Sequence, residues 1–371
     1  MNSMPQRRIK KVFSCINGAR VPESIFIYNR AHVDYNFLYL TGLHGGVFEN
    51  CGALCERDGR LVLFSTTLEE EILRGAEDYA EFVVYTNEKE RNELLKKELS
   101  QYGRIGISYE GVSHSLYVNL RDLIDGTELI DVGDAFRRAR MIKAPEEIEK
   151  IRRACDIASS VADEFPGLLK RGVTECDLAT DVDYRIHKLG ARGAAFETIV
   201  SFSPNSSKPH YSGSDVPLKE GDTVLLDFGA DYEGYVSDIT RTYFTGTPDA
   251  TLRHCYETVL EAQRIALQRI SDGAGTEQVE KEVKGFIDSY ERYRGRLIHG
   301  LGHSIGLSVH DNSYPGPEFD KIFRENMVLT VEPGIYLPGE YGIRIEDDIL
   351  VKKGTCEVLT HAMKELIVHE I

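Results

Sequence analysis

The stretch LLDFGADYEGYVSDITRTY, residues 225–243, decides the fold of the C-terminal part of the chain. Two alternating, β-branched runs flank a turn-forming segment, which is the pattern of a β-hairpin. A turn centred on Tyr232 and Glu233 would place Asp227 directly opposite Asp238. Opposed residues of a hairpin lie only about 4.5–5.5 Å apart at Cβ, where two carboxylates repel. The sequence therefore predicts that something offsets this repulsion.

The segment VLTVEPGIYLPGEYGIRIEDDILV, residues 328–351, shows the same peculiarity. Its turn residues predict a hairpin centred on Gly339, which would set Glu332 opposite Glu346. Because Pro333 cannot donate a hydrogen bond to a ladder, we expect a bulge or an edge there. Either pair of acids alone could equally face solvent. Two pairs among apolar residues instead indicate a divalent metal, since burying unpaired carboxylates is costly.

The segment RLIHGLGHSIGLSVHD, residues 296–311, adds three histidines. His299 and His303 have the spacing of a helical metal-binding pair, but Gly300 and Gly302 argue against a continuous helix. The glycines allow the backbone to approach closely, which suits a histidine presented from a constricted segment. A lone histidine is more often a packed core residue than a ligand. Three of them beside four candidate acids indicate that at least one binds metal.

Two aspartates, two glutamates and a histidine form a ligand set of hard oxygens with one imidazole. Such a set suits Mn, Co, Fe or Zn better than Ca, and the absence of thiolates argues against a structural zinc site. Two metals about 3.5–4 Å apart could share carboxylates and a water of lowered pKa. This arrangement is typical of hydrolytic enzymes such as aminopeptidases and phosphatases.

Composition excludes several classes of function for this chain of 371 residues. Hydrophobic residues at 42% and charged residues at 28% are typical of a globular protein. The net charge of −16 argues against nucleic-acid binding, and no apolar run is long enough to predict a membrane span. The basic N-terminus lacks the apolar segment of a secretory signal, and we favour an exposed start over a transit peptide. The seven scattered cysteines are typical of reduced thiols, so we expect a cytoplasmic protein.

The length and the change in pattern along the chain predict two domains. Residues 25–134 alternate short apolar runs (SIFIY, FLYLTGL and RLVLFS), which we interpret as strands, with polar helical segments, as in an α/β domain. Pro145 and the two glutamates after it start a helix. The later strands are joined by hairpin turns, which favours an α+β domain with an antiparallel sheet. We place the two domains at 1–134 and 135–371.

The motifs DFGADYEGYVSDITRT, HGLGHSIG, TVEPGIY and GIRIEDD, in this order, resemble those of the pita-bread metallopeptidase family. This family includes methionine aminopeptidase, aminopeptidase P and Xaa-Pro dipeptidase, or prolidase. The resemblance covers about residues 140–371, and YNFLYLTG is similar to the smaller domain of the creatinase and prolidase branch. It implies an α+β pita-bread catalytic domain, an antiparallel sheet with flanking helices, preceded by a smaller α/β domain. It also implies a homodimer.

By this resemblance, Asp227, Asp238, His303, Glu332 and Glu346 would hold two divalent ions per chain. Asp227 would bind one ion, Asp238 and Glu346 would bridge, and His303 and Glu332 would complete the other. Manganese is the expected metal, with Co, Zn and Fe as alternatives. Glu332 would also be the general base, since a carboxylate that touches the attacking water can take its proton.

Four more residues are candidates for contact with a substrate. By the resemblance, His210 in SKPHY and His310 would hold the substrate carbonyl and stabilise the tetrahedral intermediate. Arg344 lies two residues before Glu346 and hence on the same strand face. It would either orient the substrate or form a structural ion pair with one of the acids. For Tyr336, substrate binding and packing are both open as roles.

The resemblance implies a dinuclear peptidase that hydrolyses the Xaa-Pro bond, of dipeptides above all, by attack of a hydroxide that bridges the metals. The alternative is an aminopeptidase P, which releases the N-terminal residue of longer peptides with proline second. More distant alternatives are metal-free, creatinase-like hydrolysis and a catalytically inactive module that binds peptides or partners. Ser203, Ser304 and Asp311 stand where the family commonly has Gly, Gly and Glu. These departures remove no ligand but leave the peptide preference open.

Overall fold

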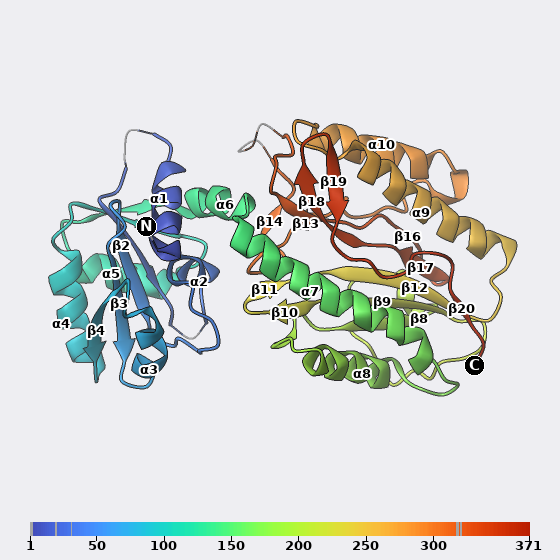
Figure 1. The fold of residues 1–371 in the computed structure, drawn as a ribbon, viewed down its shortest axis with the longest axis horizontal. Coiled ribbons are helices and arrows are strands. Elements are labelled where there is room, and N and C mark those ends of the chain that lie inside the picture. The colour runs from blue at the N-terminus through green and yellow to red at the C-terminus, as the bar shows by residue number, and fades with distance from the viewer. Residues whose placement is uncertain (1–2, 19–20, 31, 317–318, 320) are drawn as a thin grey trace. The chain divides into compact units, whose positions relative to one another are not determined.

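A computed structural model describes residues 3–18, 21–30, 32–316, 319 and 321–371. The chain forms two compact units, Met1–Arg140 and Met141–Ile371 (Figure 1). The boundary predicted at 134/135 falls within helix α6, Gly133–Met141, which contains the observed division.

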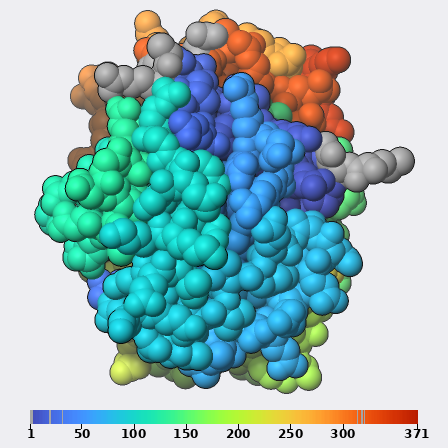
Figure 2. Space-filling view, turned by 90° about the vertical axis from the view of Figure 1, so that its left-hand side faces the viewer, coloured from blue at the N-terminus to red at the C-terminus, as the bar shows by residue number. Residues whose placement is uncertain are grey.

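The N-terminal unit is built on a mixed sheet with the strand order β4-β3-β2-β1-β5-β6. Strand β1 pairs antiparallel with β2 and parallel with β5, so parallel and antiparallel pairs are combined in one sheet of an α/β domain. The surface of this unit faces the viewer in Figure 2, in blue to teal. Its strands are β1 Ser24–Tyr28, β2 Gly52–Glu56, β3 Leu61–Thr66, β4 Glu81–Tyr85, β5 Arg104–Ile107 and β6 Glu128–Asp131. Its other helices are α1 Met4–Ser14, α2 Tyr35–Thr41, α3 Glu70–Leu73 with the 3₁₀ turn η1 Arg74–Ala76, α4 Glu88–Leu99 and α5 His114–Leu123.

One predicted strand of this unit was wrong. The run FLYLTGL lies mostly in helix α2, whereas SIFIY and RLVLFS form β1 and β3 as expected. Asp34 caps the helix by accepting a hydrogen bond from the Asn36 amide at 2.7 Å. Gly42 ends the helix in the left-handed region with φ 70°. A short apolar run shows no periodicity that distinguishes a helix from a strand. Here the capping residues at both ends favour the helix.

The C-terminal unit, Met141–Ile371, which we call the catalytic unit because it carries every candidate catalytic residue of the sequence, contains two sheets with the predicted motifs. Their strand orders are β20-β12-β9-β8 and β14-β13-β15-β18-β19. A smaller sheet, β11-β10-β7, and the hairpin β16-β17 complete it. Its strands are β7 Gly193–Ala194, β8 Ile199–Phe202, β9 Thr223–Phe228, β10 Ala230–Tyr232, β11 Tyr235–Val236, β12 Ile239–Thr245, β13 His303–Ser304, β14 Asn312–Ser313, β15 Val328–Val331, β16 Gly334–Leu337, β17 Tyr341–Arg344, β18 Asp347–Lys352, β19 Thr355–Val358 and β20 Val368–His369. Its helices are α7 Pro145–Glu164, α8 Glu175–Lys188, α9 Ala250–Arg269 and α10 Thr276–Asp288, with 3₁₀ turns η2 Phe165–Leu168, η3 Asn205–Ser207 and η4 Glu291–Tyr293.

The long helices of this unit form two pairs, α7 with α8 and α9 with α10 (Figure 1). A hydrophobic core lies under each pair. One core joins α7 and α8 to strands β8, β9 and β12, and the other joins α9 and α10 to β15 and β18. Leu226 and Phe228 of β9 pack into the first core. Because side chains alternate along a strand, Asp227 between them points to the opposite face. The helices therefore cover one face of the strands and leave the other face for the acids.

The first hairpin has a different register from the predicted one. Thr240, rather than Asp238, lies opposite Asp227. The turn is centred on Glu233 and Gly234, which both have positive φ, 49° and 81°. A two-residue hairpin turn of this kind favours glycine at such a position, which explains why the turn lies one residue later than predicted. Moving the centre by one residue moves each partner by two, so Asp227 and Asp238 keep the same face.

The second hairpin has the predicted register. Its turn is centred on Gly339, with Leu337 paired to Tyr341. The same register holds between β15 and β18, where Val331 pairs with Asp347; continued by one residue, it would set Glu332 opposite Glu346. The ladder is interrupted between β15 and β16, where Pro333 lies, as expected for a residue without an N–H.

Among the described residues, no helix has the length and apolar character that crossing a bilayer requires.

Candidate metal centre

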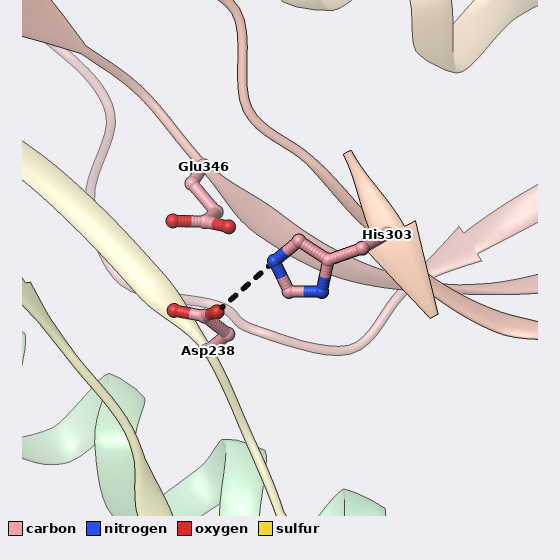
Figure 3. Close-up of side chains that lie close together, drawn as sticks. All are labelled: Asp238, His303 and Glu346. Atoms are coloured by element: carbon pink, nitrogen blue, oxygen red, sulfur yellow. Dashed lines mark ion pairs between the residues drawn. The ribbon is translucent and has the colours of Figure 1, made fainter. Parts of the chain in front are cut away.

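Three of the predicted ligands meet in the catalytic unit. Asp238, His303 and Glu346 offer ligand atoms that all lie within 4.8 Å of one another (Figure 3). His303 Nε2 is 3.6 Å from Asp238 Oδ2, the contact dashed in the figure. The three side chains come from different parts of the chain: Asp238 immediately precedes β12, His303 lies in β13, and Glu346 immediately precedes β18. The tertiary fold, and no local motif, assembles this cluster.

Glu332 and Asp227 lie at the edge of the cluster. Glu332 Oε1 is 3.5 Å from His303 Nε2. Asp227 lines the same cavity, where one of its oxygens is held in an ion pair by the Arg344 guanidinium. The structure thus brings all five predicted ligands to one place, with three of them in the tightest grouping.

The bonding of the acids fits a metal ion. Asp227 Oδ1 and Asp238 Oδ1 are buried without a hydrogen-bond partner. A buried carboxylate oxygen without a partner is costly, and a cation is the group that would satisfy several such oxygens together. Oxygen ligands with one imidazole suit a divalent transition metal. The residues present therefore fit the ions that the resemblance implies.

Burial changes the acid–base properties of this cluster. It raises the pKa of Asp238 and of Glu346 well above the ordinary range, and neighbouring carboxylates raise them further. Burial likewise raises the pKa of Glu332 to about 7, although Arg344 opposes this effect. Burial lowers the pKa of His303 to about 4, so its imidazole is neutral at pH 7, as a metal ligand must be.

Arg344 is the centre of a buried network and is only 3% exposed. Its Nε donates to Thr240 Oγ1 at 2.9 Å and its Nη1 donates to the Tyr336 hydroxyl at 2.7 Å. With its third nitrogen on Asp227, the guanidinium forms the ion pair that was one of its two predicted roles. Tyr336 is also within 2.9 Å of His299 Nε2, so its hydroxyl links the arginine to a histidine of the cavity.

Two residues that support the ligands were not predicted. Thr240 donates to Glu346 Oε2 at 2.6 Å and lies two residues after Asp238 on the same strand face. That spacing was the signal that could have identified it. The carboxylate of Asp348 accepts the Asp238 backbone amide at 2.8 Å and the Cys155 thiol at 3.3 Å. The sequence contains no local signal for this contact, since its partners are far apart in the chain.

The cluster opens into a cavity of about 830 Å³. His210 and His310, both exposed, line it together with His299. The rings of His303 and His310 lie 4.2 Å apart between centroids, which places a candidate substrate-binding histidine beside a candidate ligand. Part of the wall is apolar, formed by Phe196, Ile199 and Pro209. The cavity thus offers the acids, the histidines and an apolar surface to one small molecule.

Comparison with known proteins agrees with this geometry. The family model described as metallopeptidase family M24 matches residues 149–353, more than half of the chain. The chain belongs to metallopeptidase family M24. A second family model, the creatinase/prolidase N-terminal domain, matches residues 22–142 of this M24 chain. The family, the two-domain fold and the metallopeptidase activity predicted from the sequence are confirmed, and membership in this family implies divalent metal ions.

Relatives of this M24 protein include an uncharacterized peptidase of Staphylococcus aureus strain USA300, 34% identical over 89% of this chain and 93% of that protein. Among solved structures, an Xaa-Pro dipeptidase from Bacillus anthracis has a TM-score of 0.87 at 30% identity, over 98% of this chain and 99% of that one. An X-Pro aminopeptidase from Thermotoga maritima has a TM-score of 0.84 at 32% identity, over 94% and 97%. The names of both solved structures refer to peptides in which proline follows another residue.

Proposed function

We propose that this M24 metallopeptidase hydrolyses the Xaa-Pro bond of dipeptides with two divalent metal ions, manganese being the expected metal. The proposal rests on one observation: Asp238, His303 and Glu346 lie close together in a cavity that is also lined by Glu332 and Asp227. The similarity to an Xaa-Pro dipeptidase supports the substrate class. A homodimer remains part of the proposal on the resemblance alone, and a cytoplasmic location on the features of the sequence alone.

In the proposed mechanism, the two ions would be held by Asp227, Asp238, His303, Glu332 and Glu346. When bound, such ions supply Lewis acidity and a water whose pKa is lowered toward neutral. Glu332, with a pKa raised by burial, lies beside His303 and is placed to take a proton from the attacking water. Its Oε1 is also within 3.4 Å of the Thr330 hydroxyl, which orients it.

The other residues of the cavity position the reacting groups. His310 and His210 are placed to donate hydrogen bonds to the substrate carbonyl and to the negative charge that develops on it. Arg344 contributes by holding Asp227 and Thr240, so we propose a supporting role for it rather than direct substrate binding. The Tyr336 hydroxyl, held by Arg344 and His299, belongs to the same support.

A second candidate is an aminopeptidase that removes one residue from longer peptides with proline second. The similarity to an X-Pro aminopeptidase favours it. The two activities differ in whether the residue after the cleaved bond must carry the free carboxylate. The test compares an Xaa-Pro dipeptide with an Xaa-Pro tripeptide, using protein loaded with Mn and, separately, with Co. Cleavage of the dipeptide supports our proposal, whereas cleavage of the tripeptide alone would favour the aminopeptidase.

A variant test addresses the metal site itself. Asp227→Asn and Glu346→Gln should each lose bound metal and activity together, because each removes a charged ligand. Glu233→Gln is the matched control, since this acid lies in the turn of the same hairpin, exposed and paired with Lys150 at 3.1 Å. Metal content by plasma mass spectrometry and turnover of the dipeptide are the readouts. Wild-type protein without metal after reconstitution would instead indicate an inactive binding module.

A further inference from the structure

A buried ammonium group lies at the base of the turn that presents two of the histidines. We call residues 303–311 the histidine turn; it runs from His303 to Asp311, the residue after His310. Lys143 is 3% exposed, and its Nζ donates to Ser304 Oγ at 2.9 Å. The same Nζ is 3.7 Å from Asp311 Oδ2, in an ion pair whose side chains are 2% and 1% exposed. Removing a charged pair this completely from water is costly unless the two groups are well oriented and form further hydrogen bonds.

The partners of Lys143 are the immediate chain neighbours of the two histidines. Ser304 follows His303, and Asp311 follows His310. The rings of the two histidines lie 4.2 Å apart, so a shift of either end of the turn changes their separation. One ammonium group thus contacts both ends of the segment on which the histidines are carried.

The backbone of the histidine turn is weakly held by regular structure. Strands β13 and β14 are two residues long, and the residues between them form no helix or strand. The Asp311 amide donates to the Ser304 carbonyl at 2.9 Å. Gly306 leaves no free space, because a Cβ there would lie 2.9 Å from Asp311 Oδ2 and 3.3 Å from Lys143 Cε. The turn therefore closes tightly around the lysine.

Lys143 itself is anchored from outside the turn. Its backbone amide donates to the Asn326 carbonyl at 2.8 Å, just before β15, and helix α7 begins two residues later at Pro145. Its position is therefore fixed by the sheet and by a long helix. The lysine transmits this fixed position to the turn through its side chain.

We propose that Lys143 is a positioning residue that sets the separation of His303 and His310 by clamping Ser304 and Asp311. The proposal rests on the roles proposed above for the two histidines. It does not require Lys143 to touch metal or substrate. Displacing catalytic groups by about 1 Å can cost about 100-fold in rate, so a clamp of this kind has a measurable effect.

The test separates positioning from charge neutralisation. Lys143→Met removes one cation from the buried carboxylate of Asp311, so the variant could fail to fold. The double variant Lys143→Met/Asp311→Asn removes both charges and keeps similar shapes. We expect it to unfold within a few degrees of wild type, while kcat/KM falls about 10- to 100-fold. We also expect Co(II) to bind about 10- to 100-fold more weakly, with an altered visible spectrum.

Two further variants complete the design. Ser304→Ala removes only the 2.9 Å contact, and we expect a several-fold loss of kcat/KM at nearly unchanged stability. Arg152→Met is the matched control, because Arg152 lies on helix α7 and pairs with Glu357 at 2.9 Å, and neither residue lines the cavity. It should lower stability without changing kcat/KM or the Co(II) spectrum.

The outcomes are distinguishable. A double variant with wild-type kinetics and a wild-type Co(II) spectrum would overturn the proposal, leaving Lys143 as a mere counter-ion of Asp311. If the double variant does not fold, wild-type kinetics and spectrum of Ser304→Ala would overturn it. The Co(II) spectrum needs no peptide, so it tests the clamp even if wild-type protein cleaves no Xaa-Pro bond. That last result would contradict the proposed function alone.

Discussion

Glu332 is the residue at which burial has the clearest chemical consequence. Its pKa rises from an ordinary 4.5 to about 7, first through burial, while Arg344 opposes the rise and Asp227 adds to it. In the metal-free protein this carboxyl therefore holds a proton over a pH range in which the unfolded chain has lost it. A divalent ion can bind only after the acids lose their protons, so binding competes with protonation.

This competition predicts a pH dependence of metal stabilisation. Between about pH 4.5 and 7 the Glu332 carboxyl binds more protons in the folded, metal-free protein than in the unfolded chain, so its own contribution to stability falls as the pH rises. Metal affinity changes in the opposite direction, because fewer protons must be displaced at higher pH. We expect the difference in thermal midpoint between Mn-loaded and metal-free protein to grow from about pH 5.5 to about pH 7.5. A difference that does not change with pH would contradict this account.

At the scale of residues, the sequence was sufficient to predict which side chains meet but not what holds them. Acids in two hairpins predicted Asp238 and Glu346, and the family resemblance selected His303 among the three histidines near glycines. The supports, such as Asp348 under the Asp238 amide, depend on contacts between distant segments. No spacing in the sequence records such a contact. Lys143 was missed for the same reason, because its partners lie beyond position 300.

At the scale of elements, close backbone contacts decide where the strands carry their ligands. A Cβ on Gly302 would lie 2.2 Å from the Thr330 carbonyl oxygen and 2.7 Å from its hydroxyl. That hydroxyl also accepts the His303 amide at 3.1 Å, so β13 and β15 are in contact at the ligand itself. The glycine before His303 is therefore required by the packing of two strands.

Gly302→Ala should separate β13 from β15 and displace His303. We expect a loss of about 1–3 kcal/mol in the free energy of unfolding, the usual cost of overpacking, together with weaker metal binding. Gly285→Ala is the matched control, since nothing lies within 4 Å of a Cβ at this exposed helical position. It should stabilise α10 by about 0.5–1 kcal/mol. Urea unfolding of both variants measures the difference, and equal stability of Gly302→Ala and wild type would contradict the prediction.

Elements also show where prediction from sequence fails. The register of the second hairpin was correct because Gly339 marks the turn centre without ambiguity. The first hairpin was displaced because Glu233, a residue not expected at positive φ, occupies the turn with Gly234. The prediction that Asp227 and Asp238 share one face of the sheet still held, because a shift of the pairing by two residues leaves each side chain on the same face. Helix α2 was misread because seven residues are too few to show a helical period.

At the scale of the whole molecule, all candidate ligands belong to one of the two units. The N-terminal unit has its own core around Phe26, Leu54 and Phe64. Residues from 227 to 346 supply every predicted metal contact in the catalytic unit. A ligand that binds only the folded state stabilises it, by about 2.7 kcal/mol at a concentration 100 times Kd.

Metal removal should therefore affect the two units differently. We expect a chelator to speed hydrogen exchange in the strands around the site, β9, β12, β15 and β18. Exchange in strands β1 to β6 of the N-terminal unit should stay unchanged. Mass spectrometry of peptides from each unit, with and without chelator, provides the measurement. An equal change in both units would show that the effect of metal is not confined to the catalytic unit.

The cluster of Asp238, His303 and Glu346 also has a consequence for kinetics. These residues come from three strands that are distant in the chain, so their side chains converge only when the native topology is nearly complete. A cation cannot then act as a nucleus for folding. Interactions that are absent from the transition state slow unfolding without accelerating folding. Bound metal would thus slow unfolding of the native enzyme and leave the folding rate unchanged, so its effect would be a longer lifetime of the native state.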